Sequence, residues 1–227
     1  MARNKLFFII GILFFNTVLV AQEKILKVGD KAPGITAFKW VKGTPVTGFK
    51  KGQIYVVEFG ATWCVPCAEI IPHLTELSEK YQNKINVIGF FVMELNNDPV
   101  SAKNPAYVSR VEKYVKKQGE KMRYNVGIDD PYKSMENAWI RAAGKQGVPH
   151  TFVIDKNGMI AWIGTGIKNI ENAVVAVSSE NYDLANAVKR SRELEALETP
   201  YDWNKLLLIG GNGGNDQDFL YRSVLAK

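Results

Sequence analysis

The only two cysteines of this 227-residue chain stand three positions apart, in the segment Thr62-Trp63-Cys64-Val65-Pro66-Cys67. The residues before them, 54–59 (IYVVEF), are apolar and β-branched, which predicts a buried strand. The residues after them, 65–81, repeat apolar side chains at three- and four-residue steps, which predicts an amphipathic helix. The cysteine pair therefore lies where a buried strand leads into a helix, and the fold has to be built around that junction.

A cysteine at a helix N-terminus lies beside unpaired backbone N–H groups and the positive end of the helix dipole, which both favour the thiolate. In such motifs the pKa of a cysteine falls from about 8.5 to about 3.5–7.5. Cys64 is therefore the predicted nucleophile. Cys67 follows one helical turn later and faces inward. Its thiol is placed to resolve the mixed disulfide that Cys64 forms, which leaves a Cys64–Cys67 disulfide and a reduced substrate.

Glu58 is the only acid within the apolar strand, six residues before Cys64. A buried Cys67 needs a base, and a carboxylate at this position would take its proton directly or through a water. On an edge strand the same side chain would point to solvent, but the strand has the composition of a central one, so we expect a proton relay. Trp63 is expected to form a partly exposed platform for substrate rather than part of the core.

The rest of the chain predicts an α/β protein. Residues 85–93 (INVIGFFVM) predict a second buried strand, which would pair in parallel with the first through a right-handed crossover. Asn157-Gly158 between two apolar runs predicts a hairpin. This order implies a mixed central sheet with helices on both faces. Further expected elements are short strands at 35–40 and 45–47, helices at 104–119 and 130–144, hairpin strands at 151–155 and 159–163, and helical structure over 169–198.

Residues 1–21 have the pattern of a secretory signal peptide: Arg3 and Lys5 precede an apolar run, and Ala21 suits signal peptidase. The alternative is an N-terminal membrane anchor, but the apolar run of about fifteen residues is shorter than the roughly 20 that a bilayer requires. We therefore expect an exported protein, periplasmic and soluble after cleavage near Ala21. The formal net charge is +6, yet the basic residues are scattered, and no nucleic-acid partner is expected.

Two segments resemble the thioredoxin superfamily, in particular the exported TlpA/ResA-type thiol–disulfide oxidoreductases. They are VVEFGATWCVPCAEIIPHL at 56–74 and GVPHTFVID at 147–155, the second matching the family signature GxPxTFxID. The resemblance implies a thioredoxin-like fold and a cis Val148–Pro149 bond beside the dithiol, whose flanking backbone pairs with an extended substrate. Pro149 would shape the substrate groove, which Trp63, Pro66 and Val148 would line.

The resemblance also implies how the chain is organised and what it acts on. We expect a signal peptide at 1–21, a thioredoxin-like domain at 22–177 and a helical C-terminal extension at 178–227, which packs on the core or contacts a partner. Such proteins mostly reduce disulfides of exported proteins or peptides, without a cofactor, and take electrons from a membrane-bound protein. An oxidant or an isomerase remains an alternative, and the sequence indicates no oligomeric state. The TlpA/ResA-type proteins often carry an acid three residues after the second cysteine, and this chain has Ile70 at that position.

Three other kinds of site also use cysteine. A peroxiredoxin would need threonine three residues before its reactive cysteine, where this chain has Ala61, and haem attachment would need histidine where it has Ala68. A zinc or copper site in a non-enzymatic binding module is the remaining alternative. The two histidines stand alone in the sequence, so no metal is expected; the four candidate ligands are Cys64, Cys67, His73 and His150.

Overall fold

The structure is a computed structural model, and it describes residues 25–82, 84–94 and 106–198. Three predicted segments lie wholly or partly outside the described residues. They are the signal peptide, the first residues of the helix expected from 104, and the part of the C-terminal extension that follows residue 198. Within these three ranges, no helix has both the length and the apolar character that crossing a membrane requires.

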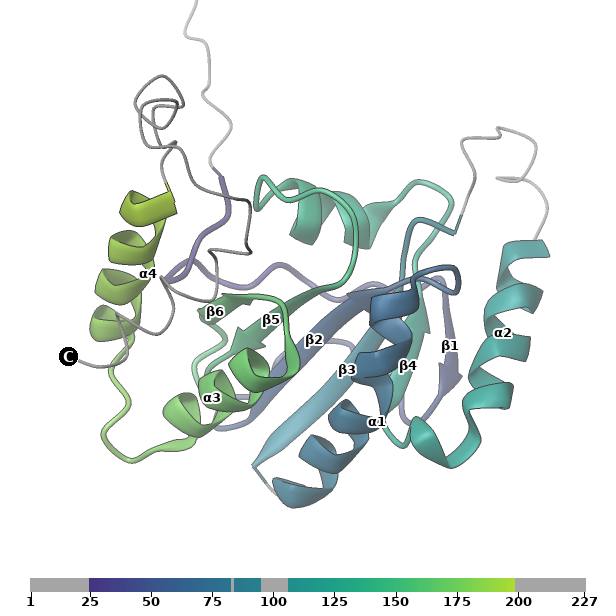
Figure 1. Ribbon diagram of the computed structural model, residues 1–227, viewed down its shortest axis with the longest axis horizontal. Coiled ribbons are helices and arrows are strands. Elements are labelled where there is room, and N and C mark those ends of the chain that lie inside the picture. The colour runs from purple at the N-terminus through teal and green to yellow at the C-terminus, as the bar shows by residue number, and fades with distance from the viewer. Residues whose placement is uncertain (1–24, 83, 95–105, 199–227) are drawn as a thin grey trace, which may run out of the picture.

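The centre of the molecule is a sheet of six strands, and the sheet is mixed, as predicted (Figure 1). Strands β2, β3 and β4 run parallel to one another, whereas β5 pairs antiparallel with β2, β6 with β5, and β1 with β4. The strand that leads to the cysteines, β2, lies inside the sheet, with three strands on one side and two on the other. In spatial order the strands are β1 (Lys39–Lys42), β4 (Asn125–Ile128), β3 (Ile85–Phe91), β2 (Ile54–Gly60), β5 (His150–Ile154) and β6 (Ile160–Gly164).

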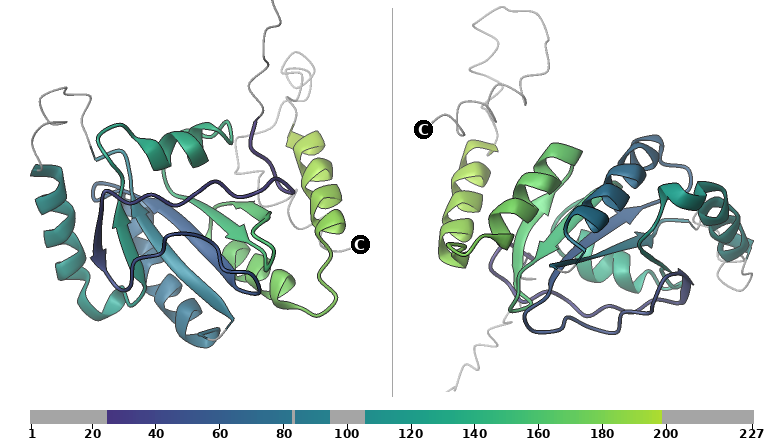
Figure 2. Two further views of the ribbon diagram at one scale, coloured as in Figure 1. Left: turned by 180° about the vertical axis from the view of Figure 1, so that it is seen from behind. Right: turned by 90° about the horizontal axis from the view of Figure 1, so that it is seen from below.

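Helices cover both faces of this sheet (Figure 2). One face carries α1 (Val65–Lys80), α2 (Ala106–Gln118) and α3 (Ile167–Ser178), whose apolar side chains share one core with the sheet. A short 3₁₀ turn, Gly119–Lys121, follows α2. The opposite face is covered by a π-helix, Glu136–Arg141, and by the chain that leads to β1. The predicted sandwich of helices around a mixed sheet is confirmed.

Alternation along β2 divides its side chains between the two cores. Ile54 and Val56 belong to the core under α1, whereas Val57 and Phe59 belong to the core on the other side. That second core is centred on Trp139, whose ring centroid lies 5.8 Å from that of Phe59. Because both faces of β2 are covered, every side chain along the strand before its last residue is buried, and this includes its single acid.

The sequence predictions were wrong at the edge of the sheet. The first strand begins at Lys39 rather than at 35, and residues 45–47 form no strand. The four-residue strand β4 was not predicted at all, because Asn125–Ile128 is too short to show a period and contains a glycine. Gly127 is required there, since a Cβ would come within 2.8 Å of the Phe90 ring.

The helix expected over 130–144 is also shorter than predicted. The carboxylate of Asp129 accepts the backbone N–H groups of Met135 and Glu136, both at 2.9 Å, so the intervening chain is held in a turn. The helical part widens to a π pattern, in which the N–H of Ala142 donates to the carbonyl of Asn137, five residues back, at 3.0 Å. Short-range bonding by Asp129 therefore replaces the first helical turn.

The C-terminal helix α4 (Leu184–Glu198) packs on the domain, as one of the two expectations had it. Val188 lies over Gly29, whose φ of +95° suits glycine, and a Cβ at Gly29 would come within 2.5 Å of the valine side chain. Lys27 pairs with Glu195 at 3.8 Å. Helix α4 thus packs against the segment before β1 and against β6. The division of the chain into two parts at 177/178 stays a prediction.

Candidate active site

The two cysteines lie at the start of α1, where the sequence predicted them. A tight turn follows β2, closed by the N–H of Cys64 donating to the carbonyl of Ala61 at 3.1 Å. Cys64 then caps α1: its backbone is extended, and its Sγ accepts the backbone N–H of Cys67 at 3.2 Å. Pro66 stands in the first helical turn, where its missing N–H leaves no bond unmade. The cap places the Cys64 sulfur at the positive end of the helix.

Cys64 and Cys67 are joined by a disulfide, so the structure shows the oxidised form of the predicted redox pair. Both cysteines are buried, with Cys64 4% exposed and Cys67 7% exposed. The chain has no other cysteine. A three-residue loop constrains the unfolded chain far less than a long one, which favours a chemical role over a structural role for this bond.

Gly60, the last residue of β2, lies next to Cys67. A Cβ at Gly60 would lie 3.4 Å from the Cβ of Cys67 and 3.6 Å from its Sγ. Glu58 stands two residues earlier on the same strand, and residues two apart on a strand share a face. Glu58 therefore points to the same side of the sheet as Gly60, the side on which Cys67 lies. The alternative position for this acid, facing solvent from an edge strand, is wrong.

Glu58 is buried in the middle of the sheet, paired with Gly89 of β3 and Thr151 of β5. The hydroxyl of Thr151 donates to its Oε2, whereas its Oε1 is buried and has no hydrogen-bond partner among the described residues. The ring of Tyr124 fills the space above Gly89, so the surroundings are largely apolar. Burial raises the pKa of Glu58 from 4.5 to about 8, and the Thr151 hydrogen bond opposes part of that rise.

The residues expected to line the substrate groove gather around the disulfide. The Val148–Pro149 peptide bond is cis, as the resemblance implied, and the carbonyl oxygen of Val148 lies 3.8 Å from the Sγ of Cys64. Trp63 is 57% exposed, and Pro66 is exposed beside it. Val65, which the sequence analysis did not single out, is exposed between them. The disulfide thus has an apolar rim with a backbone carbonyl at its edge.

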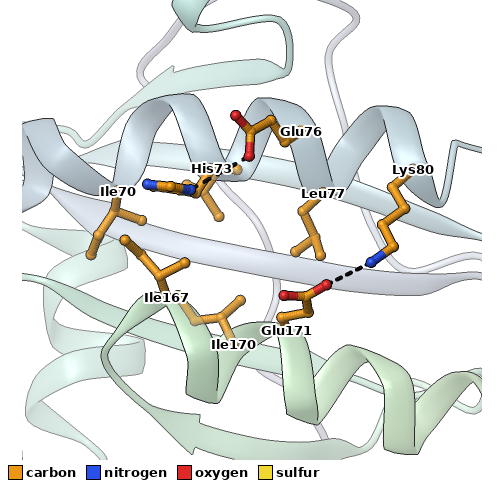
Figure 3. Close-up of a pocket in the computed structure, with 9 residues that line it drawn as sticks. Ile70, His73, Glu76, Leu77, Lys80, Ile167, Ile170 and Glu171 are labelled. Atoms are coloured by element: carbon orange, nitrogen blue, oxygen red, sulfur yellow. Dashed lines mark hydrogen bonds and ion pairs between the residues drawn. The ribbon is translucent and has the colours of Figure 1, made fainter.

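The two histidines lie in different parts of the molecule. His73 is on the exposed side of α1, paired with Glu76 at 3.5 Å, in a groove of about 150 Å³ between α1 and α3 (Figure 3). Lys80 of α1 and Glu171 of α3 close that groove with an ion pair at 2.7 Å. His150 follows the cis proline, and its Nδ1 lies 3.2 Å from the carbonyl oxygen of Gly147. Over the described ranges, no three His, Cys, Asp or Glu side chains form a group suited to a metal ion.

Sequence reasoning missed one residue beside the dithiol, Glu94. Its side chain is 2% exposed and accepts both the backbone N–H and the hydroxyl of Thr62, at 2.6 and 2.8 Å. Arg110 of α2 pairs with it at 3.1 Å. The available signal was a lone acid directly after the apolar strand 85–93, at the carboxyl end of a parallel strand, where functional groups of such sheets gather.

The chain is similar to known redox proteins over most of its described length. The family model described as Redoxin matches residues 27–190. Protein FixW of Rhizobium leguminosarum is 31% identical over 140 residues, which cover 61% of this chain and 61% of FixW, so the chain spans about three fifths of that relative. The thiol-disulfide oxidoreductase ResA of Bacillus anthracis is 26% identical over 175 residues, covering 70% of this chain and 87% of ResA.

Solved structures share the fold. A thiol-disulfide isomerase from Corynebacterium glutamicum superposes with a TM-score of 0.53 at 16% identity, over 66% of this chain and 98% of that one. The thioredoxin domain of a thiol-disulfide oxidoreductase from Bacteroides vulgatus gives a TM-score of 0.51 at 19% identity, over 68% of this chain and 99% of that one. The predicted thioredoxin-like architecture is thereby confirmed.

Proposed function

The chain belongs to the Redoxin family, and from that membership we propose that it is a thiol–disulfide oxidoreductase that reduces disulfides through Cys64 and Cys67. The observation that carries this proposal is the disulfide itself: it lies at the N-terminus of α1, against the cis Val148–Pro149 bond and on the same side of the sheet as a buried carboxyl. This site combines a nucleophile, a resolving thiol and a proton acceptor within one strand–helix junction.

In the first step the Cys64 thiolate of the reduced protein attacks one sulfur of a substrate disulfide. The substrate S–S bond breaks, one substrate sulfur leaves as a thiolate, and a mixed disulfide joins the other to Cys64. The backbone N–H of Cys67, which donates to the Cys64 sulfur in the oxidised form, is placed to stabilise the attacking thiolate as well. The helix dipole acts in the same direction.

In the second step Cys67 gives its proton to Glu58, and its thiolate attacks the Cys64 sulfur. The mixed disulfide breaks, the second substrate sulfur leaves as a thiolate, and the Cys64–Cys67 disulfide forms. Two electrons pass from the protein's thiols to the substrate. A pKa of about 8 leaves roughly a tenth of Glu58 ionised at pH 7, and this ionised fraction is a stronger base toward the Cys67 thiol than an ordinary carboxylate.

The surface around the disulfide supports an extended polypeptide as the substrate. Exposed Trp63 and Val65 provide an apolar rim, and the carbonyl of Val148 lies next to the reacting sulfur, where a substrate backbone N–H would bond it. Main-chain pairing of this kind accepts many sequences, because only the backbone is read. The substrates would therefore be disulfide-bearing proteins or peptides rather than one small molecule.

The proposal also covers the compartment in which the protein acts and the direction in which electrons flow. The signal-peptide pattern at 1–21 supports export, with a membrane-bound protein as the source of electrons in an oxidising compartment. The reduction potential of the Cys64–Cys67 pair distinguishes the directions. A value near roughly −270 mV would support a reductase, and one near roughly −120 mV would mean that the protein donates disulfides instead.

Insulin reduction tests the activity. The mature chain, with dithiothreitol as electron source, is expected to accelerate insulin precipitation, and Cys64→Ser should abolish the acceleration because the attacking sulfur is gone. Glu69→Gln, an exposed change on the same helix, serves as the control and should retain the wild-type rate. Wild-type rates in the Cys64→Ser protein would refute the proposed mechanism.

A further inference from the structure

We propose that Glu94 and Arg110 are positioning residues for the dithiol, which hold the turn that presents Cys64 and tie that turn to helix α2. The inference rests on the proposed function, since it assigns a role in the reactivity of Cys64. Neither residue touches a sulfur in the structure. Both act through the backbone of the segment that connects β2 to α1.

The turn before Cys64 is anchored at both of its central residues. The hydrogen bond from Cys64 to Ala61 leaves the N–H of Thr62 free at the corner of the turn, and Glu94 accepts it at 2.6 Å. The Thr62 hydroxyl donates to the second oxygen of Glu94 at 2.8 Å. The indole N–H of Trp63 donates to the carbonyl of Met93 at 3.1 Å. Two successive residues of the turn are thus held by Met93 and Glu94, which lie shortly after the end of β3.

The carboxylate that holds the turn is itself held from α2. The guanidinium of Arg110 contacts Glu94 Oε2 through Nε at 3.2 Å and through Nη2 at 3.1 Å, and Nη2 also donates to the Glu94 main-chain carbonyl. Glu94 is 2% exposed, so a charge there needs a partner, whereas Arg110 keeps 47% of its side chain in solvent. The main-chain contact means that Arg110 fixes the position of Glu94 as well as its charge.

The backbone at this point is held in an unusual conformation. Met93, between β3 and Glu94, has a φ of +57°, which a side-chain-bearing residue adopts only where its surroundings require it. That conformation turns the Met93 carbonyl toward Trp63 while Glu94 reaches Thr62. The segment after β3 therefore acts as a fixed support for the dithiol turn, and Arg110 is the contact that reaches it from α2.

A positioning role and a purely electrostatic role predict different changes in the pKa of the Cys64 thiol. If Glu94 and Arg110 acted only through their charges, removing the negative charge would lower the pKa of the Cys64 thiol, and removing the positive charge would raise it. If they hold the turn, either change frees Thr62 and lets the sulfur move from the N-terminus of α1. Both changes then raise the pKa of Cys64, because the thiolate loses the backbone N–H and the helix dipole.

The test is the pH dependence of Cys64 alkylation by iodoacetamide in the reduced mature protein, for Glu94→Gln and Arg110→Met. Glutamine has a single acceptor oxygen, so it cannot accept from both Thr62 and Arg110 as the carboxylate does, and methionine keeps the apolar stem of arginine. We expect both variants to be alkylated at neutral pH at least about threefold more slowly than wild type, because the fraction of Cys64 present as thiolate falls as its pKa rises. Thr62→Val, which removes one donor and no charge, should change the rate in the same direction.

Glu112→Gln is the matched control, because Glu112 is also on α2 but pairs with Lys39 of β1 at 2.6 Å and does not contact the turn. Its alkylation profile should equal that of wild type. Opposite shifts in Glu94→Gln and Arg110→Met, unchanged profiles in both, or an equal shift in Glu112→Gln would each overturn the inference. If wild-type protein failed to reduce insulin, the proposed function would fall, while the alkylation profiles would still decide whether these residues position Cys64.

Discussion

Replacing Glu58 by glutamine should make the oxidised protein more stable at alkaline pH. The folded protein raises the pKa of this carboxyl from 4.5 to about 8, because burial between β3 and β5 disfavours its charged form. Between these two values the unfolded chain releases the proton and the folded chain keeps it. The free energy of unfolding of wild type therefore falls with rising pH through this interval. Glutamine does not titrate, so its protein escapes the loss.

The size of the effect follows from the same two values. At about 1.36 kcal/mol per pH unit, the interval from 4.5 to about 8 corresponds to roughly 5 kcal/mol at most. Below pH 4.5 both states of wild type hold the proton, and the contribution vanishes. The Gln variant should retain the hydrogen bond from Thr151, since its amide oxygen replaces the carboxyl oxygen. The advantage of Glu58→Gln over wild type should thus grow from near zero at pH 4 to several kcal/mol at pH 8.5.

Urea unfolding of both oxidised proteins, followed by tryptophan fluorescence at pH 4 and pH 8.5, measures this difference. Glu69→Gln is the control, because Glu69 is exposed and its replacement should give no comparable pH-dependent gain. A Glu58→Gln advantage that stays constant across the two pH values would refute the reasoning, since it would show that the folded protein does not withhold this proton from water.

Three further changes have expected outcomes. Trp63→Ala should raise KM for insulin while changing the free energy of unfolding by about 1 kcal/mol or less, because the indole is largely exposed and makes one hydrogen bond. Trp139→Ala should lower the free energy of unfolding in urea by about 3–5 kcal/mol, because this fully buried ring lies at the centre of its core. Gly29→Ala should lower it by about 1–3 kcal/mol, because the new Cβ collides with Val188 of α4; an unchanged unfolding curve would contradict that packing.

The central part of the molecule could be predicted from sequence because its signals are local and strong. Residues 54–59 show the continuous apolar run of a buried strand, and 65–81 show helical spacing directly after it. Burial of Glu58 followed from this pattern, because an acid in a central strand has no route to solvent. The Asn157-Gly158 hairpin was equally readable, since few residue pairs accept its backbone angles.

What the sequence could not show depends on contacts between distant segments. Strand β4 takes its place by pairing with β3 and β1, and its four residues carry no period of their own. Glu94 becomes a support for the dithiol only because Arg110, sixteen residues later, approaches it and Thr62, thirty-two residues earlier, donates to it. Neither hydrogen bond can be inferred from the spacing of residues in the sequence. The two cysteines could therefore be predicted as site residues, whereas the roles of Glu94 and Arg110 could not.

Trapping of the mixed disulfide tests the central claim most directly. The reduced Cys67→Ser and Cys64→Ser proteins are mixed with a disulfide-bonded peptide, and the adducts are located by mass spectrometry. Attack by Cys64 predicts that Cys67→Ser accumulates the peptide on Cys64, since no thiol remains to release it, while Cys64→Ser accumulates little. Equal or greater accumulation on Cys67 in the Cys64→Ser protein would contradict the assignment of Cys64 as the nucleophile.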